Sequence, residues 1–331
     1  MAAFLARRLA QGALVVALSA TIVFVLIRLA PGDPFAASMA DPNISESVRA
    51  EWRKSYGLDK PVAEQYVRYL GSVARGDLGF SFSLQRPVRA ALADALPNTL
   101  LLMSIALVAS FALGIGVALA QVKRRGRRGD HLLGGISMLL FSVPDFWLAL
   151  LVLTAFTYWI PSLAHWIPAF PIGGSVDPVI HDMLDPAGRI ADRVKHAMLP
   201  ALTLTLLYFP LIARHQRAAL LDTLPSGYVM TARSKGVPER TVLRKHTLRN
   251  ALLPVIALFG LAFPALLTGA VFVEKVFSWP GMGLMIVNAI DARDYPLVTA
   301  AVLLGSTFVV IGGLATDLLH QRIDPRLRDE R

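Results

Sequence analysis

Apolar residues are grouped along the chain in six long runs, separated by segments rich in charge, glycine and proline. Each run holds about 20 or more mainly apolar residues, the length a helix needs to cross roughly 30 Å of hydrocarbon. The first run is too long for a cleaved signal peptide, and we expect it to be retained as a helix. The pattern predicts six membrane-spanning helices, at Leu9–Ala30, Pro97–Gln121, His131–Trp159, Ala197–Leu221, Ala251–Phe277 and Leu297–His320.

The composition supports an all-α, polytopic membrane protein. The 331 residues are 55% hydrophobic and 17% charged, which is outside the range of ordinary soluble domains. Cysteine is absent from the sequence, which excludes disulfides and thiolate metal sites. The net charge is +10, but the basic residues lie between the apolar runs and accompany no nucleic-acid-binding motif. We therefore expect no nucleic-acid partner.

The distribution of Lys and Arg predicts the orientation of the spans. The segments on the side of the two termini hold 19 Lys or Arg, and the segments on the other side hold 12. Eight of those 12 belong to the loop at residues 31–96, where eight acidic residues match them. Because basic residues are enriched in cytoplasmic loops, both termini are predicted to be cytoplasmic.

One loop on this cytoplasmic side has a more specific pattern. The stretch "ARSKGVPERTVLRKHTLRNALLP", residues 232–254, holds six Arg or Lys and the single acid Glu239. Charge alone fits a loop that only sets topology. However, the segment predicts a helix at Leu224–Lys235 that Gly236 ends as a left-handed cap, and Pro238 suits the first turn of a second helix. Two helices joined at such a corner make a defined shape. This shape favours a docking element.

These residues also carry a family resemblance. "YVMTARSKGVPERTVLRKHTLRNALLPVI" resembles the cytoplasmic EAA loop of ABC importer permeases, in the version of the dipeptide, oligopeptide and nickel subfamily. The stretches "APGDPF", "GDLGFSFSLQRPV", "FSWPGMGLMIVNAIDARDYPLV" and "ATDLLHQRIDPRLR" are similar to that subfamily too, in particular to the B-type permease of its pair. The chain departs from the general pattern where Met230, Thr231 and Ala232 replace Glu-Ala-Ala.

The resemblance implies a type I importer permease fold in the bacterial inner membrane and a role in peptide import. The implied partners are a second, C-type permease, two ATP-binding subunits, an external substrate-binding protein and membrane lipid. ATP and Mg²⁺ would bind the partner subunits, and none of the cofactors would bind this chain. The implied ATPase-coupling residues are Tyr228, Thr231, Ala232, Arg233, Lys235, Gly236, Arg240, Arg249, Asn250, Leu253 and Pro254. Among them, Arg233, Lys235 and Arg240 are candidates to pair with acids of the ATPase.

Motifs that would make the chain an enzyme are absent from its sequence. There is no GxxxxGK[ST] segment to cradle ATP phosphates, and neither HExxH nor GxSxG, which disfavours an intramembrane hydrolase. A self-contained channel or secondary transporter remains the alternative, although no inverted repeat supports it. The same complex could instead import nickel chelates, glutathione or sugars.

We expect three parts in the chain: residues 1–30 with the first span, an external loop domain at 31–96, and a permease core at 97–331 whose coupling loop is 222–250. The external loop predicts helices at Ser45–Tyr56 and Val62–Val73. Its turn motifs are Pro31, Gly32, Asp33 and Pro34, and then Gly76, Asp77 and Gly79. This domain is either a folded connector or a cap that presents a surface to the binding protein.

Two further segments are candidates for the pathway. In "FSWPGMG", Pro280, Gly281 and Gly283 interrupt the helix before a short one at Leu284–Ala292. That interruption is either an external gate or a re-entrant turn.

The second segment, "FSVPDFW", holds Pro144, Asp145, Phe146 and Trp147. Asp145 either faces the pathway and prefers cationic groups, or satisfies the break at the proline. An acid inside an apolar span is costly and is a functional candidate.

We expect structural roles for the other ionisable residues. Arg28 and the pair Glu274–Lys275 lie near span ends, where their side chains can reach water. Of the seven His residues, His165 and His181 are the two expected near each other. They are interpreted as loop residues, and no metal site is predicted.

Overall fold

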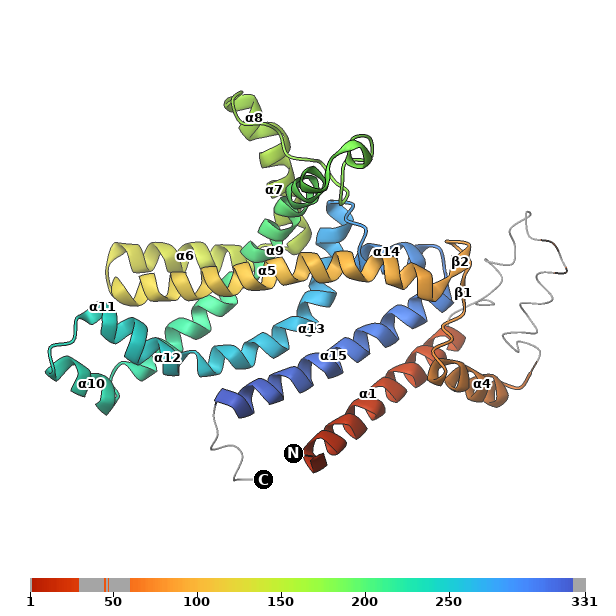
Figure 1. The fold of residues 1–331 in the computed structure, drawn as a ribbon, viewed down its shortest axis with the longest axis horizontal. Helices are drawn as coiled ribbons and strands as arrows, with labels where there is room; N and C mark the ends of the chain where they lie inside the picture. Colours follow the sequence, from red (N-terminus) through yellow and green to blue (C-terminus); the bar gives the residue numbers. More distant parts are fainter. Residues whose placement is uncertain (1, 30–44, 46, 48–59, 324–331) are drawn as a thin grey trace. The chain divides into compact units, whose positions relative to one another are not determined.

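The computed structural model describes residues 2–29, 45, 47 and 60–323 (Figure 1). Within that part of the chain the only strands form one short hairpin, β1 (Phe80–Ser81) with β2 (Arg86–Pro87), in which Phe80 faces Pro87. The longer helices are α1 (Ala2–Leu29), α4 (Val62–Ala74), α5 (Val88–Lys123), α6 (Arg128–Ser142), α7 (Asp145–Thr154), α9 (Pro186–Thr223), α13 (Leu253–Val276), α14 (Met282–Asp291) and α15 (Tyr295–Ile323). The all-α prediction is confirmed.

Five helical segments of the described residues are long and apolar enough to cross a membrane: Ala6–Leu29, Val88–Lys123, Asp145–Leu163, Pro186–Thr223 and Tyr295–Leu318. Helix α13 is a further apolar helix of 24 residues. These six helical segments coincide with the six predicted spans, except that the first part of the third predicted span lies outside them. The predicted external helix at Val62–Val73 is confirmed as α4, and the one at Ser45–Tyr56 falls mostly outside the described residues.

The prediction of one continuous span at His131–Trp159 is wrong. Helix α6 ends at Ser142, and Val143 and Pro144 are extended, with ψ angles of 134° and 139°. Proline has no amide hydrogen and excludes the helical conformation from the residue before it, so the helix stops rather than bends. The candidate span begins afresh at Asp145 and continues through a π-helical turn (Ala155–Trp159) into α8 (Ile160–Leu163).

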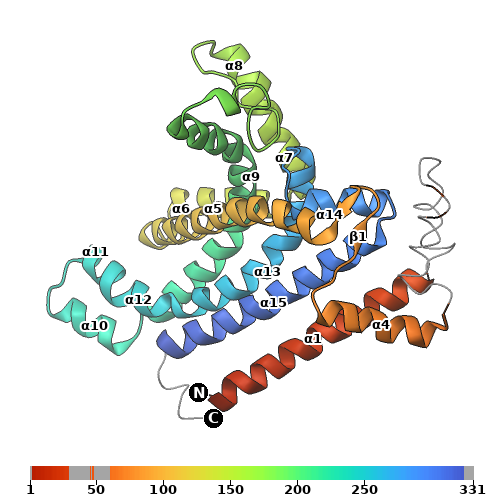
Figure 2. The ribbon, with the colours of Figure 1, turned by 45° about the vertical axis from the view of Figure 1, so that its right-hand side comes forward.

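The chain divides into two compact units. The first consists of Met1–Asn98 with Gly281–Ile311. Its core joins the start of α5 to α14 and α15 through small residues such as Ala91, Ala95 and Ala300. Helices α1 and α15 run side by side in this unit (Figure 2), and a Cβ on Gly12 would collide with Cγ1 of Val310. Glycine at this position therefore allows the two helices to approach closely.

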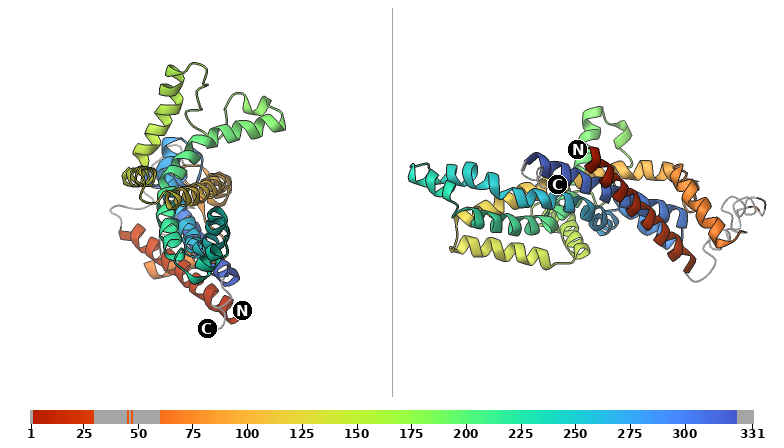
Figure 3. Two further views of the ribbon diagram at one scale, coloured as in Figure 1. Left: turned by 90° about the vertical axis from the view of Figure 1, so that its left-hand side faces the viewer. Right: turned by 90° about the horizontal axis from the view of Figure 1, so that it is seen from below.

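The second unit consists of Thr99–Pro280 with Gly312–Arg331. Helix α9, 38 residues long, is its central element and packs against α6, α7 and α13; its course beside α6 is visible in Figure 3. The core is formed by apolar side chains of α5, α7, α9 and α13, together with Phe277 and Trp279.

Glu274 in this unit corrects a second prediction. Its side chain is fully buried and accepts a hydrogen bond of 2.8 Å from Oγ1 of Thr99, so it does not reach towards water. A buried carboxylate must be hydrogen-bonded, because an unsatisfied charge in the interior is strongly destabilising. Glu274 therefore fixes α13 to α5.

Candidate functional site

The predicted docking loop forms a small folded lobe between α9 and α13. We call residues 226–252 the basic lobe; it contains α10 (Gly227–Ser234), α11 (Glu239–Thr241), a π-helical turn (Val242–Thr247) and α12 (Leu248–Ala251), as labelled in Figure 1. Helix α10 begins three residues later than predicted, because the chain first turns at Ser226, whose carbonyl accepts the amides of Val229 and Met230.

The lobe has an apolar core of its own. Val229 and Val242 are fully buried, Ala232 is 6% exposed, and Val237 packs against them. Val229 and Ala232 are three residues apart on α10 and so lie on one helix face. The core joins α10 to the π-helical turn, and the lobe is consequently a rigid element rather than a loose loop.

Gly236 ends α10 as the sequence predicts. Its φ angle is +71°, and its amide donates to the carbonyl of Arg233 (2.9 Å) while the amide of Val237 donates to the carbonyl of Ala232 (3.2 Å). This pair of bonds is the Schellman motif, in which glycine is favoured because a Cβ strains the left-handed conformation. Pro238 precedes α11 and caps it, one position earlier than expected.

Arg233 pairs within the lobe. Its guanidinium donates two hydrogen bonds to Glu239, Nη2 to Oε1 at 2.6 Å and Nε to Oε2 at 3.1 Å. The hydrogen bond from Arg233 holds the pKa of the Glu239 carboxyl below its usual value, although partial burial opposes this effect. Because both side chains are partly exposed, the pair orients the α10–α11 corner more than it stabilises it. The expectation that Arg233 is available for a partner's acid is thereby weakened.

One hydrogen bond and a shared apolar cluster fasten the lobe to α9. Gln216 is fully buried in α9, and its Nε2 donates to the carbonyl of Ala251 at 3.0 Å. Leu220 of α9 and Ala251 of α12 share a further apolar cluster with Ala118 of α5. The lobe is therefore attached directly to α9.

The outer surface of the lobe is cationic. Lys235, Arg240, Arg244, Lys245 and Arg249 are all exposed, and within the described residues no carboxylate forms an ion pair with them. The remaining predicted residues of the loop divide by exposure. Tyr228, Thr231, Asn250 and Pro254 are exposed, Leu253 is half-buried, and Met230, at 54% exposure, lies beside them.

Comparison with known proteins gives this arrangement a context. The family described as "binding-protein-dependent transport system inner membrane component" matches residues 91–329, and its N-terminal counterpart matches residues 1–103. The chain belongs to this family. It is a permease subunit of a transport system and a multi-pass membrane protein, and its relatives are named as permeases rather than as enzymes.

Three relatives resemble this permease over most of their length. The oligopeptide transport system permease protein AppB of Bacillus subtilis is 36% identical over 99% of both chains. The di/tripeptide transport system permease protein DppB of Pseudomonas aeruginosa is 36% identical over 100% of both. The glutathione transport system permease protein GsiC of Salmonella paratyphi A is 35% identical over 93% of both.

The second predicted site of the permease lies at the start of α7. Pro144 is the residue before the helix, and Asp145 is its first residue and is half-buried. An acid in the first turn interacts favourably with the helix dipole. Phe146 and Trp147 are both 49% exposed and follow on the same turn. Asp145 therefore lies at the break, and within the described residues its side chain makes no capping hydrogen bond there; both of its predicted roles stay predictions.

The third predicted site is the interruption after α13. Phe277 and Trp279 are buried, and the carbonyl of Phe277 accepts the amide of Gly174 at 2.9 Å. A Cβ on Gly173 would lie 2.7 Å from the same carbonyl oxygen, so only glycine fits there. Helix α14 starts at Met282, close to the predicted Leu284, after Pro280 and Gly281; Gly283 is buried within it. The turn is thus anchored, and a gating role stays a prediction.

The second external turn motif is described and behaves as predicted. Gly76 and Gly79 have φ angles of +74° and +81°, and Oδ1 of Asp77 accepts the amide of Gly79 at 3.1 Å. The first motif, Pro31–Pro34, lies outside the described residues.

Beyond this motif, a clamp that sequence reasoning missed joins the β-hairpin to α15. Asp294 is fully buried, and its Oδ2 accepts the hydroxyls of Ser81 (2.6 Å) and Ser83 (2.7 Å) and the amide of Ser83 (2.9 Å). Its Oδ1 accepts the amide of Leu297 at 3.2 Å and caps the helix. An Asp two residues before Pro296 at the start of an apolar run is a recognisable capping signal.

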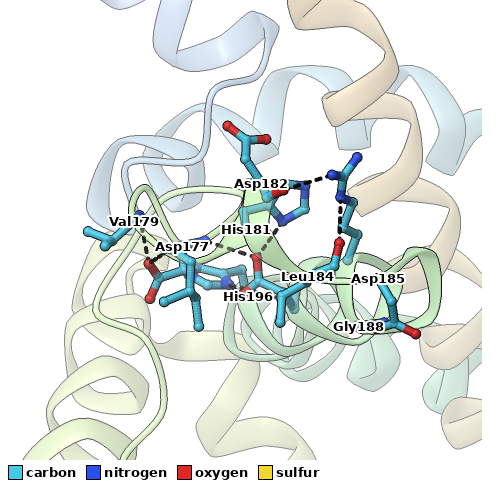
Figure 4. A network of polar contacts seen from close by, with 11 residues as sticks. Asp177, Val179, His181, Asp182, Leu184, Asp185, Gly188 and His196 are labelled. Atoms are coloured by element: carbon cyan, nitrogen blue, oxygen red, sulfur yellow. Dashed lines mark hydrogen bonds and ion pairs between the residues drawn. The ribbon is translucent and has the colours of Figure 1, made fainter.

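The histidines are paired differently from the prediction. His181 and His196 both contact Asp192, with Nδ1 of His181 2.7 Å from Oδ2 and Nδ1 of His196 3.1 Å from Oδ1. Figure 4 shows His181, His196 and Asp177 in this network of polar contacts. The amide of Asp177 also donates to Oδ2 of Asp192, at 3.0 Å. His165 is exposed and is not part of this network. The network ties the loop before α9 to the first turns of α9.

Proposed function

We propose that this chain is half of a peptide-import pathway in the bacterial cytoplasmic membrane. A second, related permease would form the other half, two ATP-hydrolysing subunits would dock on the cytoplasmic side, and an external protein would deliver the substrate. The observation that carries the proposal is the basic lobe, which has its own core, a fixed corner and a direct connection to α9.

The lobe supports a mechanical role. An ATPase that rotates on binding ATP would push on α10, and the Schellman corner and the Arg233–Glu239 pair keep α10 from yielding. The hydrogen bond from Gln216 passes the movement to α9, which packs against three other helices of the unit. Transport then requires that ATP-bound and ATP-free subunits favour different states of the permease pair.

Peptide is the substrate class that the relatives support. AppB and DppB are named for oligopeptides and di- or tripeptides, and GsiC is named for glutathione, which is itself a small peptide. The proposal places both termini and the lobe in the cytoplasm, since the Lys and Arg count favours that side.

The docking role is tested by Gly236→Asp. We expect the variant to insert and to assemble with the second permease, but to lose substrate-stimulated ATP hydrolysis and uptake, because a charged side chain is added where the ATPase approaches. Gly126→Asp is a matched control: Gly126 has a φ angle of +72°, close to that of Gly236, and a Cβ added at either glycine would meet no atom within 4 Å. Normal uptake by Gly236→Asp, or equal loss in both variants, would refute the docking role.

Orientation can be tested directly because the sequence has no cysteine. Lys235→Cys and His165→Cys introduce single thiols at exposed positions of the two predicted sides. A membrane-impermeant maleimide applied to cells with a permeabilised outer envelope should label His165→Cys, and should label Lys235→Cys only after the cytoplasmic membrane is opened. The reverse pattern would invert the topology.

Substrate and partners are tested by mild purification of the tagged chain from its native membrane, followed by mass spectrometry. A second permease, two ATPases and a binding protein carrying a peptide are the expected result. Recovery of the chain alone, from a preparation in which other transport complexes survive, would favour a self-contained channel.

A further inference from the structure

The first unit contains a cavity of about 420 Å³, which includes Asp77 and Gly79 of the second turn motif in its wall. It lies where the C-terminal end of α1, helix α4, residues 77–80 and the start of α15 meet. Its volume is in the range of sites that hold small molecules. Most of its wall is apolar, with Phe24, Ile27 and Leu303 from the two long helices, and Arg28, Arg68 and Asp77 add charge.

The cavity lies at the ends of two candidate membrane spans. The candidate spans of α1 and α15 end at Leu29 and begin at Tyr295, and both ends contribute to the wall. The interface between membrane and water is where amphipathic helices lie and where tyrosine and arginine side chains gather. Helix α4 has these properties, with Tyr66, Arg68 and Tyr69 on 13 residues.

The wall between α1 and α4 is held by specific contacts. The ring of Phe24 lies 5.3 Å from that of Tyr66 and 5.5 Å from that of Tyr69. The hydroxyls of Thr21 and Tyr66 are 2.8 Å apart, and the guanidinium of Arg28 donates to the side chain of Gln65. The cavity is therefore a built feature of this unit.

One polar group in this wall is unsatisfied. The hydroxyl of Tyr69 is buried, and no group among the described residues forms a hydrogen bond with it. Burial, with a smaller effect of Tyr66, raises the pKa of Tyr69 to about 12, so the hydroxyl is protonated at neutral pH and can donate. A buried donor without an acceptor is destabilising, which is a reason to expect a ligand oxygen here.

We propose that the cavity binds one phospholipid of the adjoining leaflet, with its phosphate and glycerol end inside and its acyl chains along α1 and α15. Arg28 and Arg68 line the cavity, and their guanidinium groups suit the phosphate. Arg68 also pairs with Glu64 at 2.7 Å, and would share its donors between that carboxylate and the ligand. Tyr69 suits a phosphate or ester oxygen. Because the wall also carries the Asp77 carboxylate, a zwitterionic headgroup such as ethanolamine fits better than an anionic one. This inference requires that the chain is inserted in a membrane, as its family is. It does not depend on peptide transport or on the direction of insertion.

The probe is phosphatidylethanolamine with a diazirine near the glycerol end of one acyl chain, incorporated with the purified complex into nanodiscs. After illumination, mass spectrometry should locate cross-links mainly within residues 24–28, 69–73 and 299–303. Excess unlabelled phosphatidylethanolamine should reduce these cross-links more strongly than the same excess of phosphatidylglycerol.

Three variants make the test specific. Ser72→Phe fills the cavity and should lower the cross-link yield at these residues at least tenfold, whereas Val67→Phe places the same ring on the exposed side of α4 and should leave the yield unchanged. Tyr69→Phe removes only the hydroxyl and should reduce the yield several-fold. Size-exclusion profiles confirm that each variant is assembled.

Two results would overturn the proposal. Cross-links spread evenly along α1, and insensitive to Ser72→Phe, would mean that only bulk lipid contacts this surface. Displacement of the probe by a dipeptide, but not by unlabelled lipid, would assign the cavity to substrate instead.

Discussion

Replacing Asp294 by alanine should release the β-hairpin from the start of α15. The carboxylate accepts four hydrogen bonds, from two hydroxyls and from the amides of Ser83 and Leu297. The hydroxyls can rotate to other acceptors, but the amides cannot. An amide left without an acceptor costs about 1–3 kcal/mol when it is buried, so the two amides together suggest a loss of about 3 kcal/mol, in the lower half of the range because Ser83 is exposed and its amide can reach water.

Asp294→Asn should be milder. The single amide oxygen of asparagine can still accept the amide of Leu297 and cap the helix, and its Nδ2 can donate to the two serine hydroxyls, so only the amide of Ser83 loses its acceptor. We expect a loss of about 1–2 kcal/mol for this variant. The measurable loss of stability expected for Asp294→Asn separates hydrogen bonding from a purely steric role, because asparagine has nearly the same size as aspartate.

The assay uses the absence of native cysteine. Val88, which follows the hairpin and is fully buried, is replaced by cysteine as a reporter, and its maleimide labelling rate measures local opening. A loss of about 3 kcal/mol corresponds to a labelling rate increased by roughly two orders of magnitude, and a loss of about 1.4 kcal/mol to a tenfold increase. Ala118→Cys, fully buried in the second unit, is the control reporter.

A labelling rate at position 88 that changes less than threefold in Asp294→Ala would refute the clamp. An equal rise at position 118 would also refute it, because the substitution would then have loosened the whole protein.

Three further sites have testable outcomes. At Gly236, Gly236→Asn should preserve more ATPase stimulation than Gly236→Ala. Asparagine tolerates a positive φ angle that costs alanine about 1–2 kcal/mol, and no atom crowds the site. Greater stimulation in the alanine variant, the smaller of the two side chains, would contradict this prediction. The depressed pKa of Glu239 means that its pairing with Arg233 stabilises the lobe above the ordinary carboxyl value of 4.5 and is lost as the pH falls through the lower, folded value. Proteolysis of the lobe should therefore be slightly faster at acidic pH, and Glu239→Gln should remove this pH dependence. A pH profile in Glu239→Gln equal to that of the wild type would contradict the stabilising role of the pair. Asp192→Asn should increase trypsin cleavage in the loop before α9 several-fold, and an unchanged digestion pattern would show that the histidine network does not hold this loop.

The sequence is a good guide to the helices because a run of about 20 apolar residues has few alternatives in a membrane protein. The cap at Gly236 was predictable for a similar reason, since few residues adopt a left-handed corner before a proline. The break at Val143 and Pro144 was missed because apolar residues continue on both sides of it. Hydropathy averages over such an interruption, and only the backbone restriction of proline reveals it.

The side-chain partners were less predictable than the elements. His181 shares Asp192 with His196 and not with His165, because Asp192 binds both of the first two rings. Only the folding of the loop against α9 brings these side chains together. Glu274 lies near a helix end, which suggested contact with water, yet Thr99 from a distant part of the sequence provides its partner. Arg233 finds its acid six residues away across the Gly236 corner, a pairing that depends on the angle between two helices.

That internal pairing has a consequence for the kinetics of assembly. The segment's single acid is occupied by Arg233, so an approaching subunit meets five exposed cations and no available carboxylate on the lobe. A complementary acidic surface would be drawn towards such a site over roughly a Debye length, about 8 Å at physiological ionic strength. Capture of the partner would then be fast in dilute buffer and slower in salt, while the lifetime of the complex would depend on the apolar contacts made after arrival.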